Sequence, residues 1–194
     1  MAYINNQGQL VYDQVDSYRV IQASYLADSQ DEHWVDDLIA WWTGLFPCNK
    51  NTPAISHTEV GFKVDGAWWF FSSTSRPELG SSGRNGTRWI KESKLLRNPK
   101  RWLLQTGGQR CNTKTAFVSD DVKTEIDRAN SLIGQPYDFI GVVFDFISPI
   151  DLIKRKRSIY CSKAVRYVLN GDFVRVSPRQ QYKWFCDNFF VTCV

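Results

Sequence analysis

The chain has 194 residues, 43% of them hydrophobic and 14% aromatic, and its net charge is only +4. This length and composition can bury one sizeable core, so we expect a single domain over residues 1–194. A transmembrane helix is excluded, because no stretch approaches the roughly 20 apolar residues that would span a bilayer. The first residues lack the basic start and apolar run of a signal peptide, so we expect a cytoplasmic location, with delivery to a virion or a host envelope left open.

Cysteine and histidine spacing argues against a metal site and against a complete disulfide framework. The cysteines form no Cys-x-x-Cys pair and no cluster with zinc-ligand spacing: Cys48, Cys111, Cys161, Cys186 and Cys193. His33 lies beside acidic residues, but the chain has only 2 histidines and no matching ligand pair. We therefore expect no cofactor and at least one free thiol.

Residues 34–45 allow two predictions. Their apolar side chains fit one stripe of a helix: Trp34, Leu38, Trp41, Trp42 and Leu45. Residues 37–42 could equally form a buried strand, because periodicity does not separate a short buried strand from a helix.

A β-hairpin is predicted over residues 56–73. Side chains alternate in a strand pattern over residues 56–64, and Asp65-Gly66 is a strong signal for a two-residue turn. Residues 67–73 then form the returning strand.

Farther along the chain, strands are predicted at residues 102–105 and 116–118, followed by a helix that starts at Ser119-Asp120-Asp121. One face of this helix is apolar: Val122, Ile126, Ala129 and Ile133. Gly134 suits its C-terminal cap and Pro136 prevents its continuation.

A second helix is predicted after Ser158, which could cap it, and Asn170-Gly171 would end it. The side chains expected on its core side are Ala164, Val165, Val168 and Leu169. Strands and helices that mix without regular alternation indicate an α+β domain.

The most concentrated positive charge is Lys154-Arg155-Lys156-Arg157. Such a run is usually a solvated loop, although an anionic envelope polymer or a lipid head group could bind it. Nucleic acid is the weakest candidate partner, because four basic residues supply charge without a surface that would read bases. The Gly/Ser-rich residues 79–86 are expected to form a loop within the domain.

The chemistry is expected at Cys161 and His57. A thiol attacks a carbonyl only as the thiolate, and a position in the first turn of a helix favours that anion, as does a nearby imidazolium. Cys161 has such a position, and a strand would hold the His57 ring rigidly against it. The imidazole would then protonate the leaving group. A buried structural cysteine and an unrelated strand histidine are the alternative interpretations.

Three segments carry a resemblance to a known family: Ser56-His57-Thr58-Glu59-Val60-Gly61-Phe62, Gly134-Gln135-Pro136-Tyr137-Asp138-Phe139 and Tyr160-Cys161-Ser162-Lys163-Ala164-Val165. In content and order they resemble the circularly permuted, NlpC-like, papain-fold hydrolases of the YiiX-like branch. The resemblance covers about residues 36–170. Within it, Asp37-Leu38-Ile39 looks similar to the strand that opens the family's barrel, which favours a strand there.

This resemblance implies a permuted papain-like (NlpC-type) fold, in which a small antiparallel β-barrel or sheet packs against the nucleophile helix. It implies a cysteine hydrolase that cleaves an amide bond, with Cys161 as thiolate and His57 as acid/base. Tyr137 and Tyr160 would lie near the substrate. A cell-wall peptide is the first expected substrate, compatible with a phage or bacterial origin. The alternative is a hydrolase of a lipid or acyl ester or thioester, or an acyltransferase, that uses the same site.

The third catalytic group departs from the family, which places a His, Asn, Gln or acidic residue on the strand after the histidine. The hairpin register sets Glu59 opposite Ser72 and His57 opposite Thr74 on one face. We expect Ser72 first, with Thr74 as the other hydroxyl and Glu59 assisting. A hydroxyl orients imidazole less firmly than a carboxylate does, so a catalytically weak or inactive binding protein, of a virion-associated kind, remains a competing prediction.

Overall fold

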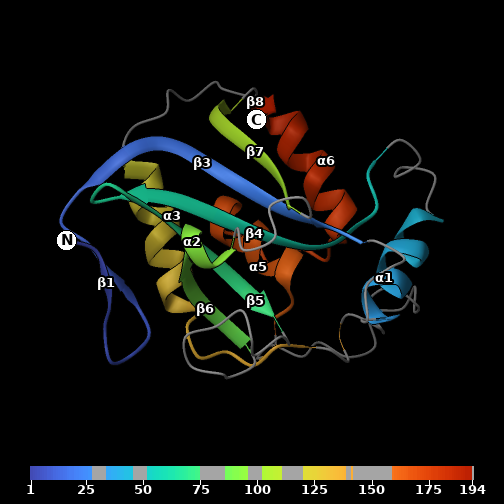
Figure 1. Cartoon of the computed structure of the whole chain (residues 1–194), viewed down its shortest axis with the longest axis horizontal. Coiled ribbons are helices and arrows are strands. Elements are labelled where there is room, and N and C mark those ends of the chain that lie inside the picture. The colour runs from blue at the N-terminus through green and yellow to red at the C-terminus, as the bar shows by residue number, and fades with distance from the viewer. Residues whose placement is uncertain are drawn as a thin grey trace.

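The computed structural model describes residues 1–27, 34–45, 52–74, 86–95, 102–110, 120–138, 141 and 159–193. Over these residues the chain is α+β, which confirms the predicted class, and its strands pair antiparallel (Figure 1). The larger sheet has the strand order β6-β5-β4-β3-β7-β8, and β1 and β2 form a separate pair.

The strands are short at the N-terminus and long in the centre of the sheet. They are β1 Tyr3–Ile4, β2 Leu10–Val11, β3 Val15–Leu26, β4 Ile55–Val64, β5 Ala67–Thr74, β6 Gly86–Lys91, β7 Trp102–Arg110 and β8 Phe189–Cys193. β3 lies between β4 and β7, so a segment before residue 36 is a central strand and the sheet extends beyond the range that the family resemblance covers.

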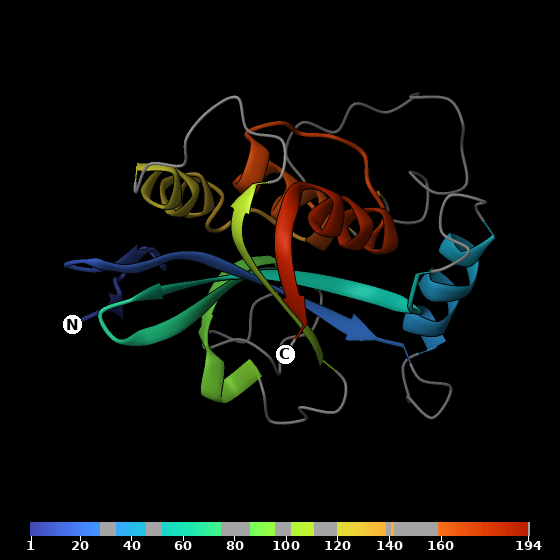
Figure 2. The same cartoon turned by 90° about the horizontal axis from the view of Figure 1, so that it is seen from above.

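The helices are α1 Trp34–Gly44, α2 Glu92–Leu95, α3 Asp120–Ser131, α5 Cys161–Asn170 and α6 Pro178–Asn188. Figure 2 shows α3, α5 and α6 together on one face of the sheet and α2 on the other. None of the helices in the described part of the chain is long and apolar enough to cross a bilayer.

The predicted hairpin is confirmed as β4 and β5. Its turn residues have positive φ angles, 47° at Asp65 and 78° at Gly66, which aspartate tolerates and glycine favours. The ladder runs from Val64 paired with Ala67 to Val60 paired with Phe71, in the predicted register. Among the described residues the β4–β5 ladder ends there. β4 stays paired with β3 as far as Ile55, and β5 stays paired with β6 as far as Thr74.

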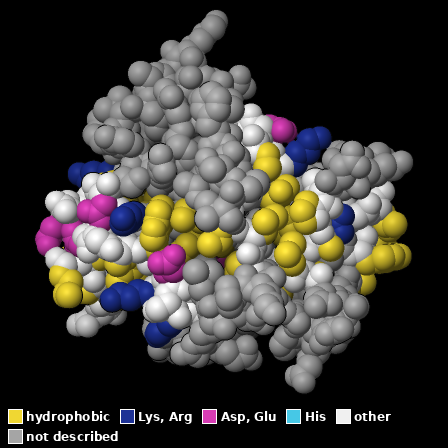
Figure 3. Space-filling view, turned by 45° about the horizontal axis from the view of Figure 1, so that its top comes forward, with side chains coloured by type: hydrophobic (Ala, Val, Ile, Leu, Met, Phe, Trp, Pro, Cys, Tyr) yellow, Lys and Arg dark blue, Asp and Glu magenta, His cyan; other side chains and the backbone are white. Residues whose placement is uncertain are grey.

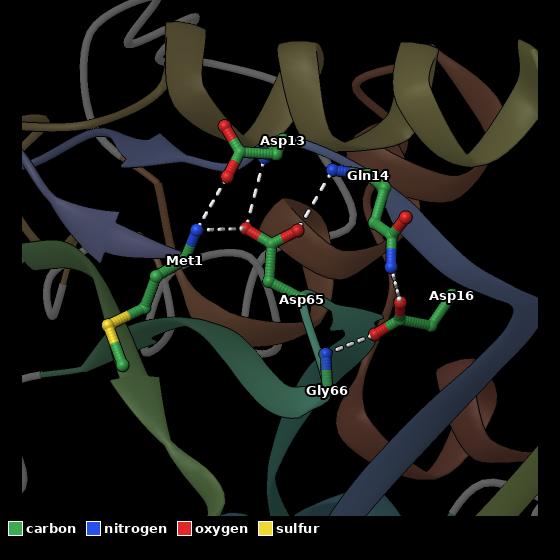
Figure 4. Close-up of polar contacts among 6 residues, drawn as sticks. All are labelled: Met1, Asp13, Gln14, Asp16, Asp65 and Gly66. Carbon is green, nitrogen blue, oxygen red and sulfur yellow. Dashed lines mark hydrogen bonds and ion pairs between the residues drawn. The ribbon is translucent and has the colours of Figure 1, made fainter.

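The Asp65 side chain also ties the hairpin to the start of β3 (Figure 4). Its carboxylate accepts backbone N–H groups from Asp13 at 3.0 Å and Gln14 at 2.9 Å. These hydrogen bonds, the one from Asp13 first, hold the pKa of Asp65 below its ordinary value. Asp16 in turn accepts the N–H of Gly66, so the turn is bound from both sides.

The strand that the family resemblance favoured at residues 37–42 is wrong, because this segment belongs to helix α1. The Thr43 hydroxyl donates to the carbonyl of Ile39, four residues earlier, at 2.8 Å, a contact that a helix makes and a strand does not. The spacing of three and four residues predicted the helix correctly, but the apolar stripe is not a buried face. Leu38 and Trp41 of the helix, and Leu45 directly after it, are 43%, 60% and 57% exposed.

The two other predicted helices are confirmed as α3 and α5. Gly134 after α3 and Gly171 after α5 have φ angles of 82° and 83°, the left-handed geometry of a helix end. All four side chains predicted on the core side of α5 are fully buried: Ala164, Val165, Val168 and Leu169. They pack against Val60, Phe62 and Phe71 of the sheet in the main hydrophobic core.

α6 was not predicted, although its first residues carry a sequence signal for a helix start. The Ser177 hydroxyl accepts the N–H of Gln180 at 3.1 Å, and the Gln180 side chain accepts the N–H of Ser177 at 2.9 Å. This is a capping box with Pro178 at the first helical position. The sequence Ser-Pro-Arg-Gln could have predicted the helix start.

The basic run at residues 154–157, the loop residues 79–85 and the strand at 116–118 lie outside the described residues. The helix cap predicted at Ser158 is wrong, because Tyr160 is the N-cap residue of α5. On the face that Figure 3 shows, basic and acidic side chains of the described residues are interspersed and form no patch of one sign.

Buried glutamines connect the sheet to α6. Gln22 of β3, Gln105 of β7 and Gln181 of α6 are each fully buried. Gln22 Nε2 donates to Gln105 Oε1 at 3.2 Å, and Gln181 Nε2 donates to Gln22 Oε1 at 3.0 Å. Arg166 of α5 donates to Gln181 Oε1 at 2.8 Å, so the chain of amides joins both helices to the centre of the sheet.

Replacing Gln181 with Leu is expected to lower the free energy of unfolding by about 1–3 kcal/mol, because the Gln22 amide oxygen stays buried without that donor. Urea unfolding followed by tryptophan fluorescence measures the change. The double variant Gln22→Leu/Gln181→Leu should lose less free energy of unfolding than the sum of the losses in the two single variants, since both hydrogen-bond partners are removed at once. If Gln181→Leu leaves the free energy of unfolding unchanged, this network does not stabilise the fold.

Candidate active site

Cys161 is the first residue of α5. Tyr160 is the N-cap residue, with extended φ and ψ of −104° and 165°, and its side chain makes no capping hydrogen bond. The first intrahelical bond runs from the Ala164 N–H to the Tyr160 carbonyl at 2.9 Å. The N–H groups of Cys161 and the two residues after it therefore precede the intrahelical bonds, and the positive end of the helix dipole lies at the thiol.

The segment before Cys161 is anchored on both sides. Ile159 forms a parallel bridge with Tyr137, and its carbonyl accepts the Asp138 N–H at 3.3 Å. The same carbonyl accepts the Ser73 hydroxyl of β5 at 2.7 Å. The Tyr-Asp segment thus holds the chain that leads into the helix, and β5 holds it from the other side.

Cys161 lies where β4 and β5 separate. α5 packs against both strands, and the β4–β5 ladder ends at Val60 among the described residues. Beyond that point the backbone N–H of Thr58 donates to the Cys161 sulfur, as does the N–H of Ser162. The strand edge and the helix start therefore supply hydrogen bonds that favour the thiolate.

His57 of β4 contacts both a carboxylate and a hydroxyl group. Its Nε2 lies 3.1 Å from Glu59 Oε1 and 3.3 Å from Ser72 Oγ. The Glu59 side chain is fully buried and that of His57 is 12% exposed. The buried carboxylate of Glu59 accepts a hydrogen bond from His57 Nε2–H. The hydrogen bond between His57 and the Cys161 thiol is therefore made by the other ring nitrogen, Nδ1.

Charge and hydrogen bonding shift both pKa values in the direction that forms an ion pair. Burial acts to lower the pKa of His57, but the charge and hydrogen bond of Cys161, followed by those of Glu59, raise it to about 9. Burial acts to raise the pKa of Cys161, but the charge and hydrogen bond of His57, with the N–H groups of Thr58 and Ser162, lower it. The site therefore favours a thiolate beside an imidazolium.

Aromatic side chains border the imidazole. The Trp102 ring packs edge-on to His57 with 6.3 Å between ring centroids, and the Tyr25 ring packs against Trp102 at 5.2 Å. Tyr25 lies opposite both His57 and Trp102 in the ladders of β3. Neither aromatic residue could be assigned to the site from the sequence, because only the β3–β4 and β3–β7 pairings bring them there.

The structure brings four of the predicted site residues together: Cys161, His57, Glu59 and Ser72. Thr74 is buried at the end of β5, opposite Gly86. Tyr160 is 1% exposed, and its hydroxyl accepts the Val176 N–H at 3.3 Å. Tyr137 is half-buried beside Ile159. Substrate contacts by the two tyrosines stay predictions.

A second cysteine side chain lies on α6. Cys186 is half-buried, and its sulfur accepts a hydrogen bond from Gln105 Nε2 at 2.8 Å. Cys48 and Cys111 lie outside the described residues. Within the described ranges, no group of three His, Cys, Asp or Glu side chains could hold a metal ion.

Comparison with known proteins adds no assignment, since neither a family model nor a curated protein matches this chain. The site geometry is therefore the basis for the function proposed below.

Proposed function

We propose that this protein is a cysteine hydrolase that attacks the carbonyl carbon of an acyl compound with the Cys161 thiolate. One observation carries the proposal: the thiol at the start of α5 is hydrogen-bonded to His57, whose other ring nitrogen contacts a buried carboxylate and a hydroxyl. A nucleophile, an acid/base and a group that orients it are the parts that covalent catalysis requires.

The proposed reaction has two halves. The sulfur forms a bond to the carbonyl carbon, and the C–N or C–O bond to the leaving group breaks while His57 Nδ1–H protonates that group. The neutral imidazole then takes a proton from water, whose oxygen attacks the acyl carbon and breaks the C–S bond. Glu59 and Ser72 keep the ring oriented and stabilise its charge in the first half.

The family and the substrate are part of the proposal. The order of His57 before Cys161, and an antiparallel sheet that packs on the cysteine helix, support a permuted papain-like, NlpC-type hydrolase. A peptide amide, as in cell-wall peptides, is then the first substrate class. Release of soluble fragments from purified peptidoglycan supports that class, and turnover of lipid esters alone moves the substrate to the acyl-ester class.

Acetylation by p-nitrophenyl acetate tests the reaction type without a known substrate. We expect release of p-nitrophenolate with one acetyl group located on Cys161 by mass spectrometry, followed by slow loss of that group to water. Cys161→Ser should abolish this labelling, while Cys186→Ser, which removes the half-buried thiol of α6, should leave it unchanged.

If the acetyl label is spread evenly over the cysteines, or persists in Cys161→Ser, the proposed hydrolase function is wrong. The fold would then serve as a binding scaffold, which is the competing function from the sequence.

A further inference from the structure

The start of α5 lies near a buried hydroxyl group that makes no hydrogen bond among the described residues. The Thr58 side chain is fully buried, and among the described residues its Oγ1 makes no hydrogen bond. A buried hydroxyl without a partner costs free energy, and native proteins retain few of them. The N-cap residue of α5 makes no side-chain capping hydrogen bond, and the backbone N–H groups of the first turn have no acceptor within the helix.

Strand geometry places the Thr58 hydroxyl at the helix start. Side chains alternate along β4, so Thr58 projects to the face opposite His57, with Val60 and Phe62. Those two residues pack in the core that contains Ala164 and Val165 of α5. Thr58 lies two residues before Val60 on β4, and Cys161 lies three residues before Ala164 on α5, which packs on β4. This packing puts the Thr58 side chain near the start of α5, and the backbone N–H of Thr58 also acts to lower the pKa of Cys161.

The nearest polar side chain across the ladder does not satisfy this hydroxyl. Ser24 of β3 lies opposite Thr58 and its Oγ accepts Gln22 Nε2 at 3.3 Å, but no hydrogen bond joins Ser24 to Thr58 Oγ1. Within the described part of the chain, Thr58 Oγ1 thus remains an unused donor beside the nucleophile.

We propose that the Thr58 hydroxyl and the backbone N–H of Cys161 together bind the carbonyl oxygen of the substrate and stabilise the oxyanion that forms there. This inference rests on the proposed hydrolase function. When the thiolate forms the C–S bond, the carbonyl π electrons move onto oxygen, and the two donors bind that negative charge. When the electrons return, the bond to the leaving group breaks and His57 supplies its proton.

The variant Thr58→Val tests this role, because valine keeps the shape of the side chain and removes only the hydroxyl. We expect acetylation of Cys161 by p-nitrophenyl acetate to fall by roughly 10²-fold, as for other single oxyanion donors. Alkylation by iodoacetamide needs the thiolate but forms no oxyanion, so its rate should stay unchanged. Thr58→Ser should restore most of the acetylation rate.

Ser56→Ala is the matched control, since the Ser56 hydroxyl on the same strand is also buried without a partner in the described residues. Its acetylation rate should equal that of the wild type. Thermal unfolding of Thr58→Val should match or exceed the wild type, because an unsatisfied buried hydroxyl has been removed.

The outcomes separate the two proposals. Wild-type protein that is not acetylated at Cys161 overturns the hydrolase function. Acetylation at the wild-type rate in Thr58→Val overturns only the oxyanion role. Equal losses of acetylation and alkylation in Thr58→Val also overturn it, since they show that Thr58 acts on the thiolate or on the structure.

Discussion

Replacing His57 with Gln is expected to slow alkylation of Cys161 by iodoacetamide at pH 6 by roughly 100-fold, because an unpaired thiol with a pKa near 8.5 is almost fully protonated there. In the wild type the imidazolium lowers the pKa of Cys161 and keeps the thiolate populated. Acyl transfer to a poor leaving group should fall further, by about 10²–10⁴-fold, since the proton donor is also lost. Mass spectrometry of each cysteine measures the alkylation rate.

The pH dependence follows from the same two shifts. The pKa of His57 is raised to about 9, so the imidazolium is present below that pH and is lost as pH rises through it. The pKa of Cys161 is lowered, so the thiolate is lost only as pH falls through that lower value. The ion pair therefore exists between the two. Amide cleavage should decline above about pH 9 in the wild type.

Cys186 is the internal control for His57→Gln, because its thiol lies on α6 and accepts from Gln105 rather than from His57. Its alkylation rate should not change. An unchanged rate at Cys161 in His57→Gln would show that the imidazole does not set the state of the thiol.

Replacing Glu59 with Gln is expected to reduce acyl transfer by roughly 10⁴-fold, the loss seen when the carboxylate of a catalytic triad becomes an amide. Glutamine can still accept from His57 Nε2, but the negative charge that helps to raise the pKa of His57 is lost. NMR titration should therefore show a lower pKa for His57. Stability should not suffer, because Glu59 is fully buried and its Oε2 has no hydrogen-bond partner in the described residues.

Ser72→Ala is the variant to compare with Glu59→Gln, because Ser72 and Glu59 both contact His57 Nε2. The Ser72 hydroxyl contacts Nε2 at 3.3 Å but carries no charge, so its removal should cost less than the Glu59 change. If Ser72→Ala lowers acyl transfer more than Glu59→Gln does, Ser72 is the main orienting group, as the sequence alone suggested.

Several parts of this site follow from local sequence. Asp65-Gly66 predicts the turn, and the turn sets the register of β4 and β5, because a two-residue loop permits only one pairing. Alternation along β4 then places His57 and Glu59 on the same face. The periodicity of α5 and its closing glycine locate Cys161 at the start of a helix. These signals are local, and each depends on backbone geometry over a few residues.

The remaining features are decided by contacts between distant segments. Periodicity could not show that residues 34–44 form a helix at the surface, because a short apolar run fits a strand equally well. Nothing near Thr58 in sequence indicates that its N–H reaches Cys161, since that contact needs β4 and β5 to separate. β3 brings Tyr25 and Trp102 to His57 through strand pairing. The residues proposed to carry the chemistry could be named from the sequence, whereas their surroundings depend on the tertiary structure, because burial and hydrogen bonding across the sheet shift the pKa values of His57 and Cys161.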